Sequence, residues 1–163
     1  MARPTKPTDP RGYMGVYKTL DSVPDRRRLS QHAAAYDGRN VWVEYLDERL
    51  FDSVTSDRFQ RHAELVGEAW GDHTSARGRH HALATPDDVE TWFAHLLDQY
   101  TVETVGTRRF RWLEGFFTWL QCHTDHPHVY HPLWMAAADP DAPATGALWD
   151  FKIGRCRSGG DEA

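Results

Sequence analysis

Apolar residues recur with the spacing of an amphipathic helix in four segments of the chain. These segments are residues 41–51, the stretch after Thr55 and Ser56, the stretch after Thr85, and residues 104–120. Weaker patterns predict short helices over residues 26–36 and 133–138. No segment alternates apolar and polar residues as a half-buried strand would. The pattern therefore predicts an all-α fold.

Capping residues predict where these helices begin. Thr85 offers a side-chain cap, Pro86 suits the first helical position, and the acids that follow favour the helix dipole. Ser56 or Thr55 is expected to cap the preceding helix. Thr104 is expected to begin the longest helix, after a short connection over residues 100–103. Residues 71–81 are polar and contain glycine, which predicts a loop.

The same patterns divide the chain into three regions. Residues 1–38 contain prolines without a sustained period and are expected to form an irregular arm with a short helix. Residues 39–139 form the predicted helical domain. Residues 140–163 are rich in Pro and Gly, and we expect a flexible or loosely docked tail there.

Two motifs in the helical domain resemble a known family. The first is Thr85-Pro86-Asp87-Asp88-Val89, and the second is residues 113–120, Leu-Glu-Gly-Phe-Phe-Thr-Trp-Leu, preceded by Thr104 and an arginine-rich turn. Their order and spacing resemble the N-terminal SAM-like, or core-binding, domain of tyrosine recombinases and phage integrases. The stretch from Tyr36 to Trp42 resembles the front of haloarchaeal integrase-like proteins from mobile elements. One departure is that Thr104 stands nine residues before Leu113, whereas the family commonly places its Thr at eight, which puts direct phosphate contact by Thr104 in doubt.

The resemblance implies a SAM-like bundle of four to five helices that binds double-stranded DNA, as in DNA integration and recombination. A full-length recombinase is a second expected partner. The family's catalytic domain follows its DNA-binding domain, and the residues after Asp139 contain neither Tyr nor His. We therefore expect a protein without catalytic activity and without a cofactor. The residues expected to contact DNA are Arg58, Arg61, Thr104, Thr107, Arg108 and Arg111.

Charge bears on this expectation in two ways. The net charge is −5, which is unusual for a nucleic-acid-binding protein. Arginines nevertheless gather at residues 26–28 and again at 108, 109 and 111. Arg suits phosphate because its planar guanidinium donates two parallel hydrogen bonds. The alternative for each cluster is a solvated helix face.

Two other function classes stay open at this point. A helical protein–protein interaction module would suit the acidic balance. A metalloprotein would use His123, His126, His128 and His131 with Cys122, with His80 and His81 as further ligands. Trp112, Phe116, Phe117 and Trp119 are read as core aromatics rather than as a surface for stacking bases. The chain has no apolar run long enough for a membrane span and no signal peptide, which predicts a cytoplasmic protein.

Overall fold

The computed structural model of the protein describes residues 8–50 and 56–161, and none of these residues forms a strand. The all-α helical bundle expected from the sequence is confirmed. Its α-helices are α1 (Ala33–Tyr36), α2 (Val41–Tyr45), α3 (Asp57–Ala76), α4 (Pro86–Leu97), α5 (Val102–Val105), α6 (Arg111–Cys122), α7 (Pro132–Ala138) and α8 (Pro143–Asp161). Four short 3-10 helices precede α1, namely η1 (Pro10–Gly12), η2 (Leu20–Ser22), η3 (Asp25–Arg27) and η4 (Leu29–His32). Two π-helical turns are η5 (Leu46–Leu50) and η6 (Gly106–Phe110).

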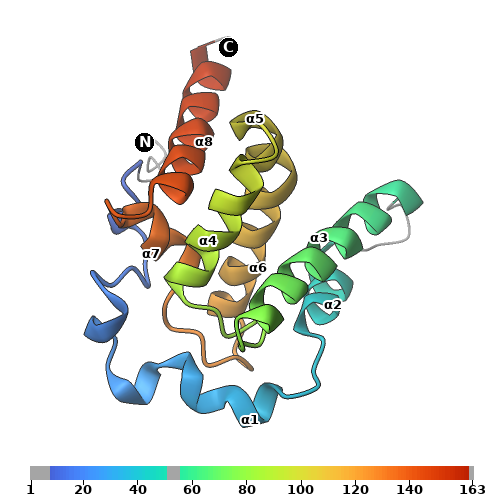
Figure 1. Cartoon of the computed structure of the whole chain (residues 1–163), viewed down its shortest axis with the longest axis vertical. Helices are drawn as coiled ribbons and strands as arrows, with labels where there is room; N and C mark the ends of the chain where they lie inside the picture. Colours follow the sequence, from blue (N-terminus) through green and yellow to red (C-terminus); the bar gives the residue numbers. More distant parts are fainter. Residues whose placement is uncertain (1–7, 51–55, 162–163) are drawn as a thin grey trace, which may run out of the picture.

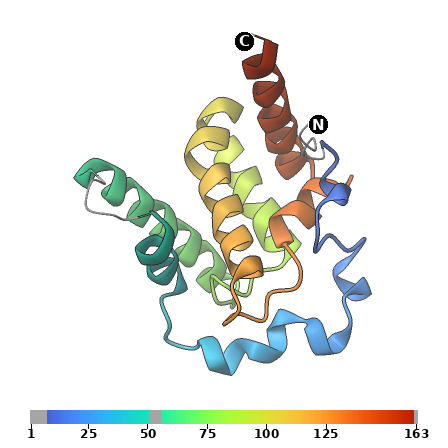
Figure 2. The ribbon, with the colours of Figure 1, turned by 180° about the vertical axis from the view of Figure 1, so that it is seen from behind.

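The centre of the bundle is built around α4 and α6. The two helices run in opposite directions, joined over the top by α5 (Figure 1), and the view from behind shows the same arrangement (Figure 2). Phe93 of α4 packs against Phe110 just before α6, with ring centroids 5.6 Å apart. The apolar residues that α4 and α6 direct inward are buried: Trp92, Phe93, Leu96, Leu113 and Phe116. On its other sides α4 packs most extensively against α7 and α8.

The start of α4 matches its sequence signal. The Thr85 side chain accepts a hydrogen bond from the Asp88 backbone N–H, and the Asp88 carboxylate accepts one from the Thr85 N–H. Asp88 is fully buried and also pairs with Arg77 and Arg79, at 2.6 and 2.7 Å. Burial alone would raise the pKa of Asp88, but these hydrogen bonds and the nearby arginines hold it below its ordinary value. The buried carboxylate therefore fastens the loop before α4 to the first turn of the helix.

The helix expected from Thr104 begins earlier. Thr101 is its N-cap, since its side chain accepts a hydrogen bond from the Thr104 N–H at 3.2 Å. Segments α5, η6 and α6 follow one another without a break. The earlier start buries Val105 and places Glu103 in the first turn, where a negative charge favours the helix dipole. Thr104 is thus an internal residue of the first turn.

The prediction of a loop over residues 71–81 is wrong for the first half of this range, because α3 continues to Ala76. Its polar residues occupy the solvent side of a helix. Thr74 faces inward, is buried, and its hydroxyl is within hydrogen-bond distance of the carbonyls of Trp70 and Gly71. The chain turns just afterwards at Gly78, whose φ of 76° lies in the left-handed region that glycine tolerates.

The expected tail is instead the helix α8, which packs on α4 and α7. Its start is capped from another helix, because the Glu90 carboxylate of α4 accepts hydrogen bonds from the backbone N–H groups of Ala144 and Thr145. Leu148 and Trp149 are buried against the bundle. The pattern in residues 140–163 missed this helix because its cap is distant in sequence.

The arm over residues 8–38 runs around the outside of the bundle (Figure 1). The short helix expected over residues 26–36 is divided into η3, η4 and α1. Val23 and Leu29 are buried, and Tyr13 packs against Trp134 with ring centroids 4.6 Å apart. The Trp149 indole N–H donates to the Thr8 carbonyl at 2.8 Å. The arm is therefore an integral layer of the fold.

Candidate nucleic-acid interface

A groove of about 620 Å³ lies between α3 and α6. The ribbon of α3 leans away from α6 toward its N-terminal end, which is visible from both sides (Figures 1 and 2). The groove is lined by Tyr45, Phe59, His62, Thr107, Arg108, Arg111, Trp112 and Gly115. None of these described lining residues is acidic.

One wall of the groove carries half of the residues expected to contact DNA. Thr104, Thr107, Arg108 and Arg111 follow the i, i+3, i+4, i+7 spacing of a single helix face. The last three line the groove, and both arginines are exposed. Arg108 belongs to the π-helical turn η6, a feature that is frequent at functional sites. This face of the helix therefore presents two guanidinium groups to the groove.

The threonines of this face have hydroxyl groups engaged within the helix. The Thr107 hydroxyl donates to the Glu103 carbonyl at 2.8 Å. The Thr104 hydroxyl accepts from Thr101 at 3.0 Å, and Thr104 is not among the lining residues. The bond of Thr107 to the preceding turn occupies the donor that a phosphate would need, and Thr104 lies outside the groove. The arginines are left as the available donors to an anion.

The opposite wall differs from expectation. It is formed by Phe59 and His62 of α3, whereas the exposed residues Arg58 and Arg61 do not line the groove. Arg61 lies near two carboxylates of its own helix, Glu64 at 3.6 Å and Glu68 at 4.0 Å. Arg58 and Arg61 are thus not brought together with Arg108 and Arg111 in one pocket.

Aromatic residues of the groove were assigned to the core by the sequence pattern. Phe116, Phe117 and Trp119 are buried as expected, but Trp112 is half-buried and lines the groove. Phe59 shares the helical stripe of α3 and is nevertheless 41% exposed. A stripe identifies the inward side of a helix, and α3 leans away from α6 where Phe59 lies. Spacing alone therefore could not separate groove residues from core residues.

The electrostatic environment of the groove favours a neutral His62. Partial burial lowers the pKa of His62, and the positive charge of Arg109 lowers it further, while the Arg108 carbonyl acts in the opposite direction. Arg109 is itself half-buried, and burial lowers its pKa from the ordinary value. An anion placed beside Arg108 would oppose the effect of the arginines on His62.

A glycine allows the floor of the groove to form. A Cβ atom at Gly115 would stand 2.6 Å from the Tyr45 hydroxyl oxygen, closer than real contacts allow. Tyr45 of α2 can therefore lie close against α6. Its ring also packs against Phe116 and Trp119 of the core.

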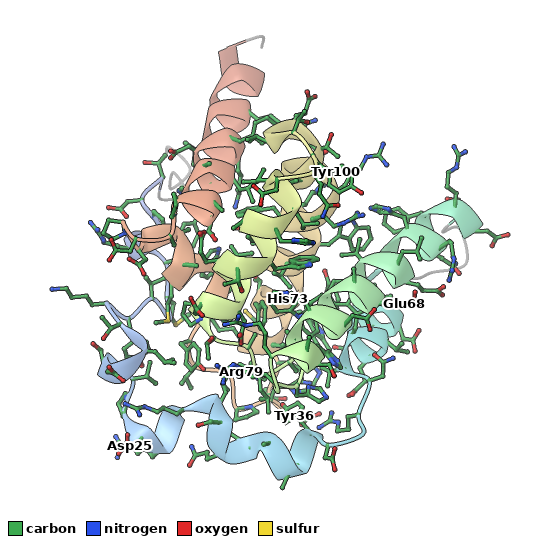
Figure 3. All side chains as sticks on the ribbon, viewed as in Figure 1. Asp25, Tyr36, Glu68, His73, Arg79 and Tyr100 are labelled. Atoms are coloured by element: carbon green, nitrogen blue, oxygen red, sulfur yellow. The ribbon has the colours of Figure 1, made fainter. Side chains whose placement is uncertain are left out.

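Arg28, from the arginine cluster at residues 26–28, has a structural role in the arm. The Arg28 side chain donates to the carbonyls of Val23 and Asp21, at 3.1 Å each, and pairs with Asp25 at 3.4 Å. Asp25 lies on the opposite side of the molecule from Glu68 of α3 (Figure 3). Arg28 therefore holds the arm together, far from the groove.

The histidines considered as zinc ligands lie in two separate places. His81, His126 and His128 belong to one cluster with Tyr36, whose hydroxyl is 2.5 Å from His126 Nδ1. His81 accepts from backbone N–H groups at the start of α2, and His128 Nε2 is 2.6 Å from the Ala82 carbonyl. Each of these three histidines thus has one ring nitrogen engaged with a protein group.

His131 is separate and fully buried, where its Nδ1 accepts from the Trp134 N–H to cap α7. Within residues 8–50 and 56–161, no group of three or more His, Cys, Asp or Glu side chains is arranged to hold a metal ion. The arrangement of these histidines gives no support to the metalloprotein alternative.

Comparisons with known proteins leave the resemblance as a prediction. A scan against models of protein families found no match. Searches of curated proteins and of solved structures found no significant similarity either. In the part of the chain that the structure describes, no helix has the length and apolar character needed to cross a membrane.

Proposed function

We propose that the protein binds double-stranded DNA through its phosphates, using Arg108 and Arg111 in the groove between α3 and α6. The observation that carries this proposal is the pair of exposed arginines on one groove wall, without an acidic side chain among the described lining residues. Guanidinium groups bind phosphate oxygens through two parallel hydrogen bonds. Phosphate contacts position a protein on a duplex without reading much sequence.

The net charge of −5 does not prevent such contacts. At physiological salt, charges separated by more than about 8 Å are largely screened from one another, so a phosphate responds mainly to nearby groups. The acidic body opposes approach from a distance, most strongly at low salt. We therefore expect modest affinity that depends on contacts within the groove.

The family resemblance supports the same assignment. The arginines follow the Thr-Pro-Asp-Asp-Val motif and precede the motif of residues 113–120, as in core-binding domains of site-specific recombinases. We propose a role in DNA integration or recombination without strand cleavage by this chain, with a full-length recombinase as a partner. The cytoplasm is the compartment in which such a role would operate.

Duplex affinity measured across a salt series tests the proposal. Arg108→Ala and Arg111→Ala should each weaken binding to all duplex sequences alike, and each should make the slope of log K against log salt shallower by about one. Arg61→Ala is the matched control, because this arginine lies outside the groove beside Glu64. Fluorescence anisotropy with a labelled duplex gives both quantities. Unchanged affinity and slope in both groove variants would reject the proposal.

A protein–protein interaction module is the second candidate, and a specific surface favours it. Another groove, between α2 and α3, is lined by the acidic residues Glu64, Glu68 and Asp72 together with Arg39 and Arg79. Mixed charges of this kind suit a protein partner better than a nucleic acid. A parent protein that shows no duplex binding in the salt series would favour this candidate.

A further inference from the structure

The groove between α3 and α6 contains aromatic rings beside its arginines. The rings of Phe59 and Trp112, from the two groove walls, pack directly against each other, with centroids 5.2 Å apart and planes inclined by 45°. The His62 ring lies 5.8 Å from Trp112 on the same side. The two arginines are sufficient to bind a phosphate. A ligand that also contacted the aromatic rings would need an apolar face.

Phe59 is the exposed residue of the apolar stripe that it forms on α3 with Ala63, Val66 and Trp70. It is 41% exposed and lines the groove, whereas Val66 and Trp70 on the same stripe are fully buried. Leu65 is similarly exposed, at 44%, but it does not line the groove. Phe59 thus presents part of its ring at the edge of a cavity whose size suits a small ligand, since such sites usually measure roughly 300–1,000 Å³.

The charge of the groove restricts the ligand further. Two arginines line it, no described lining residue is acidic, and the acidic groove between α2 and α3 is separate. The complementary ligand is an anion that also carries a flat apolar group. An unpaired nucleotide has both, because its phosphate is charged and its base is free to stack on an aromatic side chain.

We propose that the groove between α3 and α6 holds an unpaired nucleotide of a DNA strand, with its base against Phe59 and Trp112 and its phosphate on Arg108 and Arg111. This inference rests on the proposed function and extends it from the phosphates of a duplex to a nucleotide with an unpaired base, as in single strands, flaps or junctions. In a uniform duplex the bases are stacked on each other, so their faces are not offered to Phe59. The protein therefore prefers strands with free bases over duplex at equal salt.

The test compares three labelled ligands of equal length: a single-stranded DNA of mixed sequence, its duplex, and a single strand in which sugars without bases replace the nucleosides. The abasic strand carries the same phosphates and no rings. The parent protein should bind the single strand about fivefold to a hundredfold more tightly than the abasic strand, the range expected for stacking of one base. The single strand should also be bound more tightly than the duplex.

Variants of the whole protein assign this preference to the groove. Phe59→Ala should lower affinity for the single strand by about fivefold to a hundredfold and should make the protein nearly indifferent to removal of the bases. Phe59→Tyr keeps a ring and should keep the preference. Leu65→Ala is the matched control, since it removes an equally exposed apolar side chain of α3 outside the groove. Circular dichroism checks that each variant is folded.

The outcomes separate this inference from the proposed function. If Phe59→Ala binds the single strand and the abasic strand as the parent does, the base-binding inference is wrong. The proposed function still holds in that case, provided that Arg108→Ala weakens binding to duplex. If Arg108→Ala and Arg111→Ala both leave binding to all three ligands unchanged, the proposed function fails and the inference fails with it.

Discussion

Phe116 illustrates how a single residue supports both the core and the groove. Its ring is fully buried and packs against Trp42 at 4.9 Å and Tyr45 at 5.6 Å between ring centroids. Tyr45 continues into the floor of the groove. The core therefore fixes the position of one groove residue directly.

Replacing Phe116 by Ala should lower the free energy of unfolding by roughly 3–5 kcal/mol, because it removes a buried ring and leaves a cavity. Urea denaturation followed by circular dichroism measures this change. Phe59→Ala is the comparison, since that ring is partly exposed and its loss should cost much less. An equal decrease in the free energy of unfolding in both variants would contradict the burial of Phe116 and the partial exposure of Phe59.

Side chains were predictable from the sequence where their role depends on local spacing. The face carrying Thr107, Arg108 and Arg111 follows directly from helix periodicity. Phe59 was missed because its exposure depends on the angle between α3 and α6, which no local pattern encodes. Arg58 was expected to contact DNA together with Arg108 and Arg111, yet its helix presents other residues to the groove.

The starts of the helices were likewise predictable where the capping residue lies in the same segment as its helix. Thr85 and Ser56 cap helices within their own segments; Thr85 was predicted, and Ser56 was one of two predicted candidates with Thr55. The start at Thr101 was missed in favour of Thr104, since both are threonines with the same capping group, three residues apart. Helix α8 was missed because its first turn depends on Glu90, more than fifty residues earlier.

The cap that Glu90 provides for α8 can be tested by substitution. Glu90→Ala should destabilise the fold by about 1–2 kcal/mol, because the N–H groups of Ala144 and Thr145 lose their acceptor. Glu90→Gln retains one acceptor oxygen and should fall between the alanine variant and the parent. Chemical denaturation gives the order of stabilities, with exposed Glu68→Ala as a control. If the alanine variant is as stable as the parent, the cap contributes nothing.

The whole molecule should be less stable in mild acid. Burial lowers the pKa of His81 and His128 from 6.5 to about 4, and that of His131 to about 3. The unfolded chain therefore binds more protons than the folded protein once the pH falls below about 6.5. Stability is fully present above that pH and is lost progressively down to the folded pKa values.

From about pH 7 to about pH 5, each of these histidines should reduce the free energy of unfolding by about 1–2 kcal/mol. Urea denaturation at the two pH values measures the total. His128→Gln should make the dependence shallower, since it removes one titrating group and keeps an N–H donor for the Ala82 carbonyl. His95→Gln, on an exposed position of α4, should not change it. Equal stability at both pH values would show that these histidines are not held neutral by the fold.

The hydrogen bond from Trp149 to the Thr8 carbonyl joins residues 141 positions apart. During synthesis the N-terminal part emerges first, but the surface on which it packs includes α8, which is made after the other described helices. Bringing the two ends of a long loop together costs conformational entropy. The contact that offsets this cost can form only after both ends have been synthesised. We therefore expect the central helices to assemble early and the arm to attach in a late step, after the ribosome has completed α8. Until the arm attaches, the rings of Tyr13 and Trp134 would be exposed and accessible to chaperones. Attachment of the arm therefore determines when this apolar surface of the nascent protein becomes buried.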